Sequence, residues 1–311
     1  MVILRDYENL KLTEKSVVAI GFFDGVHKGH RQVLQQLLEV SEKEGLTPCV
    51  FTFDLTGEES PKENFSLLCD LDEQARLLEE AGVAVLFRPK FSEISHLTPE
   101  ETVVDLLAGR LAASAVVAGY DLRFGKKAAG DLAYLQEKGG EAGIRVFPVA
   151  PVMFDGQAIS STRIREAVKT GDTDAVKMML GRPFSFSSRV CDGQKLGRTL
   201  GFPTLNQEIP SNITLPRFGV YCSLVECEGV CYQGVTNIGI RPTVGGELPL
   251  AETHLLHAAG DFYQKNSHVQ LLSFLRPEQK FDSVAHLQRG IAADILTAEA
   301  YFSALEKGPK K

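Results

Sequence analysis

The sequence predicts two domains: an α/β domain with a parallel sheet covered by helices on both faces, and then a β domain that ends in a packed helix. The first half alternates strand-like and helix-like runs, which is typical of a parallel sheet. The second half has short strand-like runs separated by turns, which indicates an antiparallel sheet or barrel. The helix stop Gly181-Arg182-Pro183 separates the two patterns. We therefore expect domains at residues 1–181 and 182–311, as a length of 311 residues favours.

The strands expected in the first half are short and apolar. They cover residues 17–20, 49–53, 83–87, 115–118 and 143–149. Helices are expected after residue 30, over residues 70–81, from Thr98 and from Asp172. The start at Thr98 is a capping box with proline in the first helical position. Ligands bind beyond the carboxyl ends of parallel strands, and three polar residues follow such ends: His27, Asp54 and Asp121.

The second half is expected to form a sheet without intervening helices. Its strands cover residues 189–191, 219–226, 230–237, 252–257 and 269–274. One amphipathic helix follows, capped by Ser283. Its apolar face carries Leu287, Ile291, Ile295 and Leu296. We expect this face to pack on the barrel.

The composition excludes several classes of protein. Hydrophobic residues make up 44% and charged residues 23%, as in ordinary soluble proteins. A formal charge of −7 argues against a general nucleic-acid binder. No apolar run approaches a membrane span and no signal-peptide pattern is present, so we expect a cytoplasmic protein. The six cysteines contain no Cys-x-x-Cys pair, which favours reduced thiols over a metal site.

The first half is organised around Gly21-Phe22-Phe23-Asp24-Gly25-Val26-His27-Lys28-Gly29-His30, here called the histidine turn. A strand leads into it and a helix follows, the arrangement in which helix N–H groups meet a phosphate. His27 and His30 flank Gly29. Imidazole can donate to phosphate oxygens as a neutral or a charged ring, and glycine lets the backbone approach a ligand closely. The turn therefore predicts a phosphate site.

Two further motifs of the first half suit a nucleotide. Asp121-Leu122-Arg123-Phe124-Gly125 follows a strand end at Gly119. Ile159-Ser160-Ser161-Thr162-Arg163-Ile164-Arg165 places two serines where either can cap the next helix, with two arginines beside its free N–H groups. A serine-capped helix with nearby arginines suits triphosphate recognition.

These motifs resemble those of the bifunctional bacterial riboflavin kinase/FAD synthetase family, and the resemblance spans nearly the whole chain. The histidine turn resembles the family's nucleotidyltransferase signature, and residues 159–165 match its Ile-Ser-Ser-Thr-x-Ile-Arg motif. The resemblance implies a Rossmann-like FMN adenylyltransferase domain over residues 1–181 and a riboflavin-kinase barrel over residues 182–311. It implies catalytic roles for His27 and His30. It implies ATP contacts at Gly21, Phe22, Phe23, Asp24, Gly29, Asp121, Ser161, Thr162 and Arg165.

Two motifs of the second half extend the resemblance. Residues 196–206 resemble the riboflavin kinase signature, Gly-Phe-Pro-Thr-x-Asn, and residues 234–243 match Val-x-Asn-Ile-Gly-x-Arg-Pro-Thr. The family's catalytic glutamate then falls on Glu252. Thr204 and Asn206 face one way in an extended segment, and their oxygens are ligands suited to Mg²⁺. The resemblance also implies ATP contacts at Gly197, Arg198 and Pro203, and flavin contacts at Asn237, Arg241 and Thr243.

The chain departs from the family pattern in two places. Phe53-Asp54-Leu55-Thr56-Gly57 stands where the family usually reads Phe-x-Pro-His-Pro, so the histidine and both prolines are lost. Asp261-Phe262-Tyr263-Gln264-Lys265 stands where the family has a Leu-Tyr-Gly-Lys region, and His257 replaces a common aspartate. The first departure touches the expected adenylylation site.

The sequence thus predicts an enzyme that phosphorylates riboflavin to FMN and adenylylates FMN to FAD, both from Mg-ATP. The expected partners are these small molecules, with no nucleic acid or membrane, and the sequence carries no signal for an oligomeric state. Without a Walker A sequence, a P-loop kinase is excluded. One alternative is a riboflavin kinase whose first half binds nucleotide with weak or lost adenylyl transfer. Another is a flavin or nucleotide sensor, which would have no reason to keep Glu252, Thr204 and Asn206 together.

Overall fold

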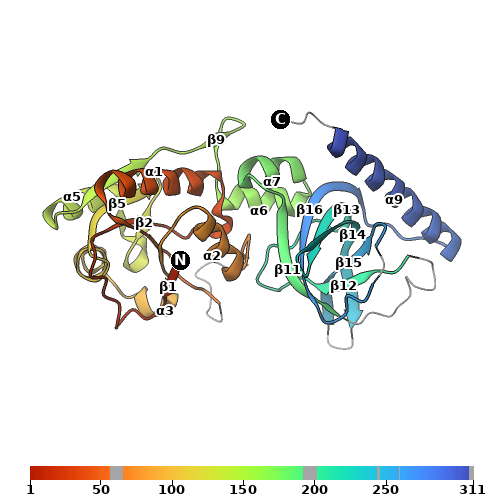
Figure 1. Ribbon diagram of the computed structural model, residues 1–311, viewed down its shortest axis with the longest axis horizontal. Helices are drawn as coiled ribbons and strands as arrows, with labels where there is room; N and C mark the ends of the chain where they lie inside the picture. The colour runs from red at the N-terminus through yellow and green to blue at the C-terminus, as the bar shows by residue number, and fades with distance from the viewer. Residues whose placement is uncertain (57–65, 192–201, 244–245, 259, 308–311) are drawn as a thin grey trace. The chain divides into compact units, whose positions relative to one another are not determined.

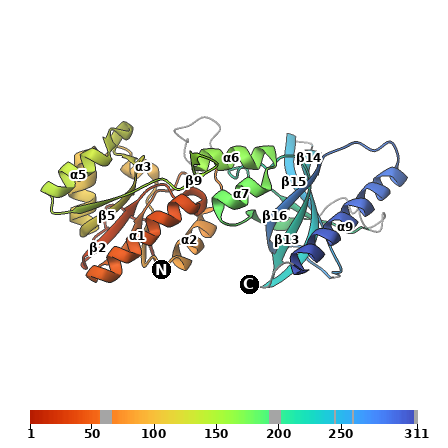
Figure 2. The ribbon, with the colours of Figure 1, turned by 90° about the horizontal axis from the view of Figure 1, so that it is seen from above.

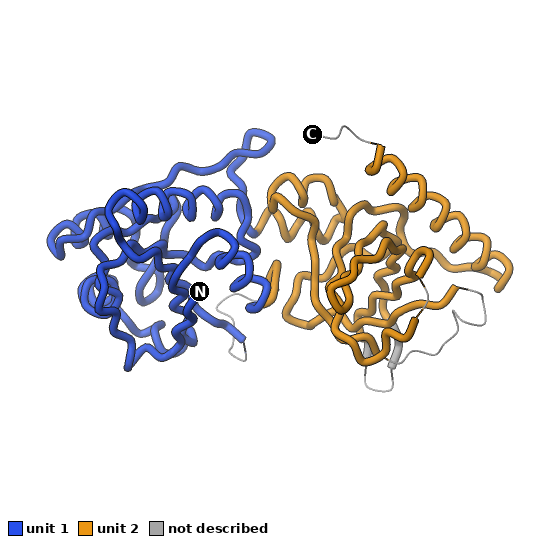
Figure 3. The backbone as a smooth tube through the Cα atoms, in the orientation of Figure 1, with its two compact units in different colours: residues 1–65, 71–161 blue, residues 66–70, 162–311 orange. Residues whose placement is uncertain are grey.

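Figure 1 shows the computed structural model, which describes residues 1–56, 66–191, 202–243, 246–258 and 260–307. It describes the backbone alone at residues 241–243 and 246–247. The chain divides into two compact units (Figure 3). The first contains Met1–Phe65 and Leu71–Ser161, and the second contains Ser66–Asp70 and Thr162–Lys311.

A six-stranded parallel sheet forms the centre of the first unit. In spatial order its strands are β1 (Val2–Leu4), β4 (Val85–Phe87), β3 (Thr47–Phe51), β2 (Ser16–Ile20), β5 (Ala113–Gly119) and β8 (Arg145–Val149). The predicted parallel sheet is confirmed, and β1 joins it as an edge strand that the sequence pattern did not reveal. Two short hairpins accompany it: β6 (Arg123–Phe124) with β7 (Gly130–Asp131), and β9 (Met153–Phe154) with β10 (Gln157–Ala158).

Helices cover both faces of this sheet, as predicted (Figure 2). Val17 and Ala19 of β2 pack into one core with α1 (Lys28–Glu44) and α2 (Leu71–Glu80). Their neighbours on β2 point to the other face, where the core includes residues of α5 (Leu132–Glu141). Both faces are buried, which is why the strand is apolar along its length.

The capping box at Thr98 is confirmed, but the helix continues in an unexpected form. The Thr98 hydroxyl accepts from the backbone N–H of Glu101, and the Glu101 carboxylate accepts from the backbone N–H of Thr98. After α4 (Pro99–Glu101) the chain forms a π-helix, η2 (Thr102–Arg110). A π-helix of this length is rare, and the apolar spacing of the segment does not distinguish it from an α-helix.

The second unit contains a closed barrel of six antiparallel strands. In spatial order they are β11 (Phe184–Cys191), β12 (Leu205–Glu208), β15 (Gly246–Leu255), β14 (Val230–Thr243), β13 (Gly219–Cys227) and β16 (Asn266–Pro277). Before the barrel come α6 (Ser161–Thr170) and α7 (Thr173–Leu180), and after it comes α9 (Val284–Lys307). Ala298 and Phe302 of α9 pack on Val220 and Val235 of the barrel, which confirms the predicted packed helix. The predicted face is wrong at Leu296, which is exposed, because the contact turns toward Ile295, Ala298 and Phe302.

Hydrogen-bonded polar groups from all six strands lie inside the barrel and fix which way the neighbouring residues point. The chain of bonds runs from the Ser188 carbonyl through Ser267, Gln207, Thr253 and Thr236 to Ser223. Adjacent residues of a strand point to opposite faces. Because Gln207, Thr253 and Thr236 point inward, Asn206, Glu252 and Asn237 point outward.

None of the helices in the described part of the chain has the length and apolar content that a membrane crossing requires.

Candidate active sites

The histidine turn connects β2 to α1 through backbone conformations that are uncommon for its residues. Phe23 has a φ of 52° and Val26 a φ of 40°. A positive φ is unusual for a β-branched residue and costs about 1–3 kcal/mol. Both side chains are buried in the core under α1. Packing therefore holds a strained turn at the carboxyl end of β2, where a parallel sheet places its ligands.

The two histidines of the turn stack on each other. Their ring centroids lie 3.6 Å apart at an interplanar angle of 15°. His27 Nδ1 accepts a hydrogen bond of 3.2 Å from the backbone N–H of His30 and so caps α1. This fixes the neutral tautomer of His27, with its proton on Nε2. His30 Nδ1 is buried and has no hydrogen-bond partner within the described part of the chain.

Burial and then the neighbouring His27 ring hold the pKa of His30 well below its ordinary value of 6.5. The imidazole of His30 is therefore neutral near neutral pH and can act as a hydrogen-bond donor without carrying charge. Gly29 leaves room for the ring of His27 at the start of α1, because a Cβ at position 29 would lie 3.0 Å from Cε1 of His27. The sequence predicts that Gly29 lets a ligand approach the backbone, and the structure adds that Gly29 leaves room for the ring of His27.

The Phe22 carbonyl is held by two residues that the sequence reasoning missed. The Thr52 hydroxyl donates to it at 2.9 Å, and Gln74 Nε2 donates at 3.0 Å. Thr52 follows β3 at the same edge of the sheet, a position from which it could have been suspected. Gln74 lies on α2 and contacts the buried Arg88, whose Nη1 lies 3.4 Å from its Oε1. These hydrogen bonds hold the backbone of the turn at Phe22, within the predicted ATP contacts Gly21 to Asp24.

The remaining predicted nucleotide contacts are placed as follows. In the first unit, the Ser161 hydroxyl donates to the carbonyl of the buried Asp24 at 3.3 Å. Asp121 is exposed and follows β5. In the second unit, Thr162 is exposed and Arg165 Nε donates to the Ser66 carbonyl at 2.6 Å.

Asp54, which follows β3 where the chain departs from the family pattern, forms a closed polar cluster with Thr56 and Lys90. Its Oδ2 lies 2.9 Å from Lys90 Nζ, and its Oδ1 accepts from the backbone N–H and the hydroxyl of Thr56 at 2.7 and 2.6 Å. Burial opposes ionisation, but the bonds from Thr56 and Lys90 outweigh it and lower the pKa of Asp54. Asp54 is thus ionised, and Lys90 compensates its charge.

Three residues predicted from separate motifs lie in one row across the barrel. Glu252 on β15 is directly opposite Asn206 on β12 and directly opposite Asn237 on β14. All three point to the outer face. The row continues to Val220 on β13 and then to Arg276 on β16.

This row borders a cavity of about 200 Å³ between the barrel and α9. The barrel strands contribute Val220, Val235, Asn237, Glu252, His254 and Arg276 to its lining, the segment before β12 contributes Phe202 and Thr204, and α9 contributes Leu287, Ile291 and Asp294. Asn206 is buried in the row beside the cavity. The cavity combines apolar walls with a few convergent polar groups, as ligand sites do. Gly197 and Arg198 lie outside the described residues, as do the side chains of Arg241 and Thr243.

Helix α9 is fixed to the barrel at this cavity by an ion pair that the sequence did not reveal. Arg276 Nε and Nη2 donate to the two carboxylate oxygens of Asp294 at 2.8 and 2.7 Å. Bidentate pairs of this kind are stronger than ordinary hydrogen bonds. Asp294 falls on the same helical face as the predicted apolar residues Leu287 and Ile291. This spacing is the only feature of the sequence that indicates that Asp294 faces the barrel.

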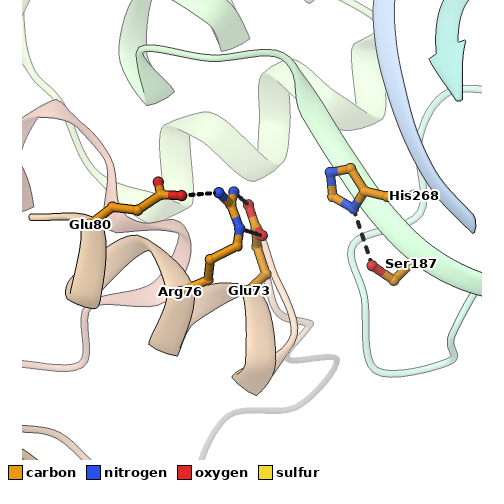
Figure 4. Close-up of polar contacts among 5 residues, drawn as sticks. All are labelled: Glu73, Arg76, Glu80, Ser187 and His268. Atoms are coloured by element: carbon orange, nitrogen blue, oxygen red, sulfur yellow. Dashed lines mark hydrogen bonds and ion pairs between the residues drawn. The ribbon is translucent and has the colours of Figure 1, made fainter. Parts of the chain in front are cut away.

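Figure 4 shows two polar groupings that lie outside the cavity. On α2, Arg76 pairs with Glu73 at 2.8 Å and with Glu80, on the helix that also carries Gln74. On the barrel, Ser187 and His268 are cross-strand partners, with 3.1 Å between the serine hydroxyl and the histidine Nδ1. None of these five residues lines the cavity beside Glu252, so we assign them no catalytic role.

The two halves of the chain match two known family models. A riboflavin kinase model matches residues 180–302, and an FAD synthetase model matches residues 9–163. The bifunctional riboflavin kinase/FMN adenylyltransferase of Escherichia coli K12 is 38% identical, over 97% of this chain and 98% of the relative. This chain belongs to the bifunctional riboflavin kinase/FMN adenylyltransferase family.

A second relative of this name and one solved structure are also similar to this chain. The Bacillus subtilis enzyme of the same name is 33% identical over 94% of each chain. A crystal structure described as a macrolide-efflux protein from Streptococcus pneumoniae superposes with a TM-score of 0.86 at 29% identity, over 96% of this chain and 98% of the other. The family resemblance and the predicted fold class, a Rossmann-like sheet followed by a barrel, are confirmed.

Proposed function

We propose that this chain phosphorylates riboflavin to FMN and then adenylylates FMN to FAD, using ATP in both reactions. The observation that carries the proposal is the row of Asn206, Glu252 and Asn237 beside a cavity in the barrel, on a chain whose other half carries the stacked histidine turn. The alternative of a kinase with a degenerate first half is not favoured, because both family models match.

In the kinase reaction Glu252 would accept the proton of the ribityl hydroxyl as that oxygen attacks the γ-phosphate of ATP, the bond from the γ-phosphorus to the bridging oxygen breaks, and ADP leaves. Its position on a barrel strand, opposite two amide side chains, would direct the carboxylate toward the substrate. Asn237, and by the family resemblance Arg241 and Thr243, would orient the flavin. Phosphoryl transfer is catalysed mainly by positioning and charge stabilisation, and the rigid row supplies the positioning.

The donor set beside Glu252 fits Mg²⁺. Thr204 and Asn206 offer neutral oxygens, and within the described residues no cluster of three or more His, Cys, Asp or Glu side chains could form a protein-only cage. Mg²⁺ commonly binds through few protein oxygens and the phosphates of the nucleotide. Thr204 and Asn206 would hold it, and bound Mg²⁺ would neutralise charge on the phosphates. Gly197, Arg198 and Pro203 are the proposed ATP contacts of this half.

In the adenylylation reaction a phosphate oxygen of FMN attacks the α-phosphate of ATP and pyrophosphate leaves. Nε2 of His27 carries the proton in that tautomer and would donate to a phosphate oxygen, and neutral His30 would donate beside it. The amino end of α1 adds backbone N–H groups. Gly21, Phe22, Phe23, Asp24, Gly29, Asp121, Ser161, Thr162 and Arg165 are the proposed ATP contacts. Because FMN phosphate is already ionised, this step needs no strong base.

The proposal is tested by incubating the purified chain with riboflavin and Mg-ATP and separating the flavins by chromatography. We expect FMN and then FAD. FMN without FAD would support the kinase-only alternative, and no conversion would support a sensor. Since both reactions consume ATP, we also propose that the protein works in the cytoplasm.

A further inference from the structure

His254 lies two residues after Glu252 on β15, on the same outer face of the barrel, and lines the same cavity. Its Nδ1 lies 2.9 Å from the carbonyl oxygen of Pro203. A carbonyl can only accept, so Nδ1 carries the proton and donates this bond. The ring also meets Phe202 edge to face, with centroids 5.8 Å apart at 85°. One side chain thus contacts two successive residues of the segment that leads into β12.

Residues 202–204 do not pair with β15 through the backbone ladder. The ladder between β12 and β15 begins with Leu205 opposite Thr253. Residues 202–204 precede it, and Pro203 has no backbone N–H with which to extend the pairing. The imidazole of His254 therefore acts in place of a backbone donor. Its hydrogen bond to the Pro203 carbonyl connects β15 to the residues just before β12. The residue held directly beside this bond is Thr204, which lines the cavity.

We propose that His254 is a positioning residue of the kinase reaction: it fixes the Pro203 carbonyl and thereby holds the Thr204 hydroxyl at the cavity, beside Glu252. This inference rests on the proposed function, in which Thr204 holds the Mg²⁺ that binds with ATP. His254 acts through Pro203 and Thr204 on the Mg-ATP side of the site. The flavin side, which the proposal assigns to Asn237, does not depend on this bond.

The test compares variants of the full chain. In His254→Phe the ring can still pack on Phe202 but cannot donate, whereas in His254→Asn the amide nitrogen can occupy the place of Nδ1. A lost neutral hydrogen bond is worth about 0.5–1.5 kcal/mol, which corresponds to roughly a threefold to tenfold change. We expect His254→Phe to lower kcat/KM for Mg-ATP by that factor in FMN formation, with the KM for riboflavin changed less than twofold. His254→Asn should recover most of the loss.

The control is His268→Phe, which alters a barrel histidine outside the cavity and should leave FMN formation unchanged. His254→Gln serves as a second variant if His254→Phe does not fold, because its longer side chain moves the donor away from the Pro203 carbonyl. The inference is overturned if the donor-free variant matches the unaltered chain, if the KM for riboflavin rises equally, or if asparagine gives no recovery. Failure of the proposed function looks different: the unaltered chain itself would form no FMN.

Discussion

Asn206 and Glu252 lie directly opposite each other on the paired strands β12 and β15. Side chains in such positions have Cβ atoms about 4.5–5.5 Å apart, so the proposed metal contact and the proposed base are neighbours by construction. Asn237 faces Glu252 from the other side. A shift of either strand by one residue would turn these side chains into the barrel. The hydrogen-bonded polar groups inside the barrel fix the register of the strands and so keep Asn206, Glu252 and Asn237 on the outer face.

Glu252 is expected to be the base of the kinase reaction. Glu252→Gln keeps the size and shape of the side chain but removes the proton acceptor, so FMN formation should fall by about 10²–10⁴-fold. Initial rates of FMN formation from riboflavin measure this. Glu226→Gln, which changes an exposed glutamate on β13 outside the cavity, is the matched control. Undiminished FMN formation by Glu252→Gln would remove Glu252 from the mechanism.

The pair of Arg276 and Asp294 is expected to hold α9 against the cavity beside Glu252. Asp294→Ala removes both bonds and leaves the partly buried Arg276 uncompensated, so the free energy of unfolding should fall by about 1–3 kcal/mol. The KM for riboflavin should rise, because the wall of the cavity loosens. Denaturant unfolding and steady-state kinetics measure the two effects. Glu306→Ala, at an exposed position of the same helix, should change neither. An unchanged KM in Asp294→Ala would show that the pair does not shape the cavity.

His30 should make the stability of the chain depend on pH. Its pKa is lowered in the folded state, so below 6.5 the unfolded chain takes up a proton that the folded chain does not. The free energy of unfolding should therefore be highest above pH 6.5 and fall as the pH drops toward the lowered value. The limiting slope for one proton is about 1.4 kcal/mol per pH unit. His30→Gln, which does not titrate, should flatten the profile between pH 5 and pH 7. An identical slope in both proteins would contradict the assignment.

The proposed boundary between Gly181 and Arg182 predicts a separable kinase. Every residue that lines the cavity follows this boundary, so a fragment of residues 182–311 should fold and phosphorylate riboflavin. A fragment of residues 162–311 should be more stable, because Val176 and Met179 of α7 are buried in the second unit and α7 contacts β11 and β16. Thermal unfolding and FMN formation compare the two. If only the longer fragment is active, the functional boundary lies before α6.

The sequence predicted the parts of the site that depend on local pattern. The strand and helix around the histidine turn, the capping box at Thr98 and the single face shared by Thr204 and Asn206 follow from residue spacing. It did not predict contacts between distant segments, such as Thr52 and Gln74 at the Phe22 carbonyl or Ser66–Asp70 in the second unit. These depend on packing, which periodicity does not encode. The cluster of Asp54 with Lys90 likewise joins the ends of two neighbouring strands.

That cluster bears on the rate of FAD formation. The histidine lost after Phe53 would have been a charge-stabilising donor, and the loss of one such donor typically costs about 10²–10³ in rate. Lys90 offsets the charge of Asp54, so the site should not repel phosphate outright. FAD synthesis is therefore expected to be detectable but slower than FMN synthesis.

The central claim, that one chain carries two separate active sites, is tested most directly by a time course of flavins formed by the unaltered chain, Glu252→Gln and His30→Ala. Each protein receives Mg-ATP with either riboflavin or FMN. We expect the unaltered chain to accumulate FMN first and FAD later. Glu252→Gln should form FAD only from supplied FMN, and His30→Ala should form FMN but no FAD. The account is contradicted if either substitution abolishes both reactions, if FAD survives His30→Ala, or if FAD appears as fast as FMN.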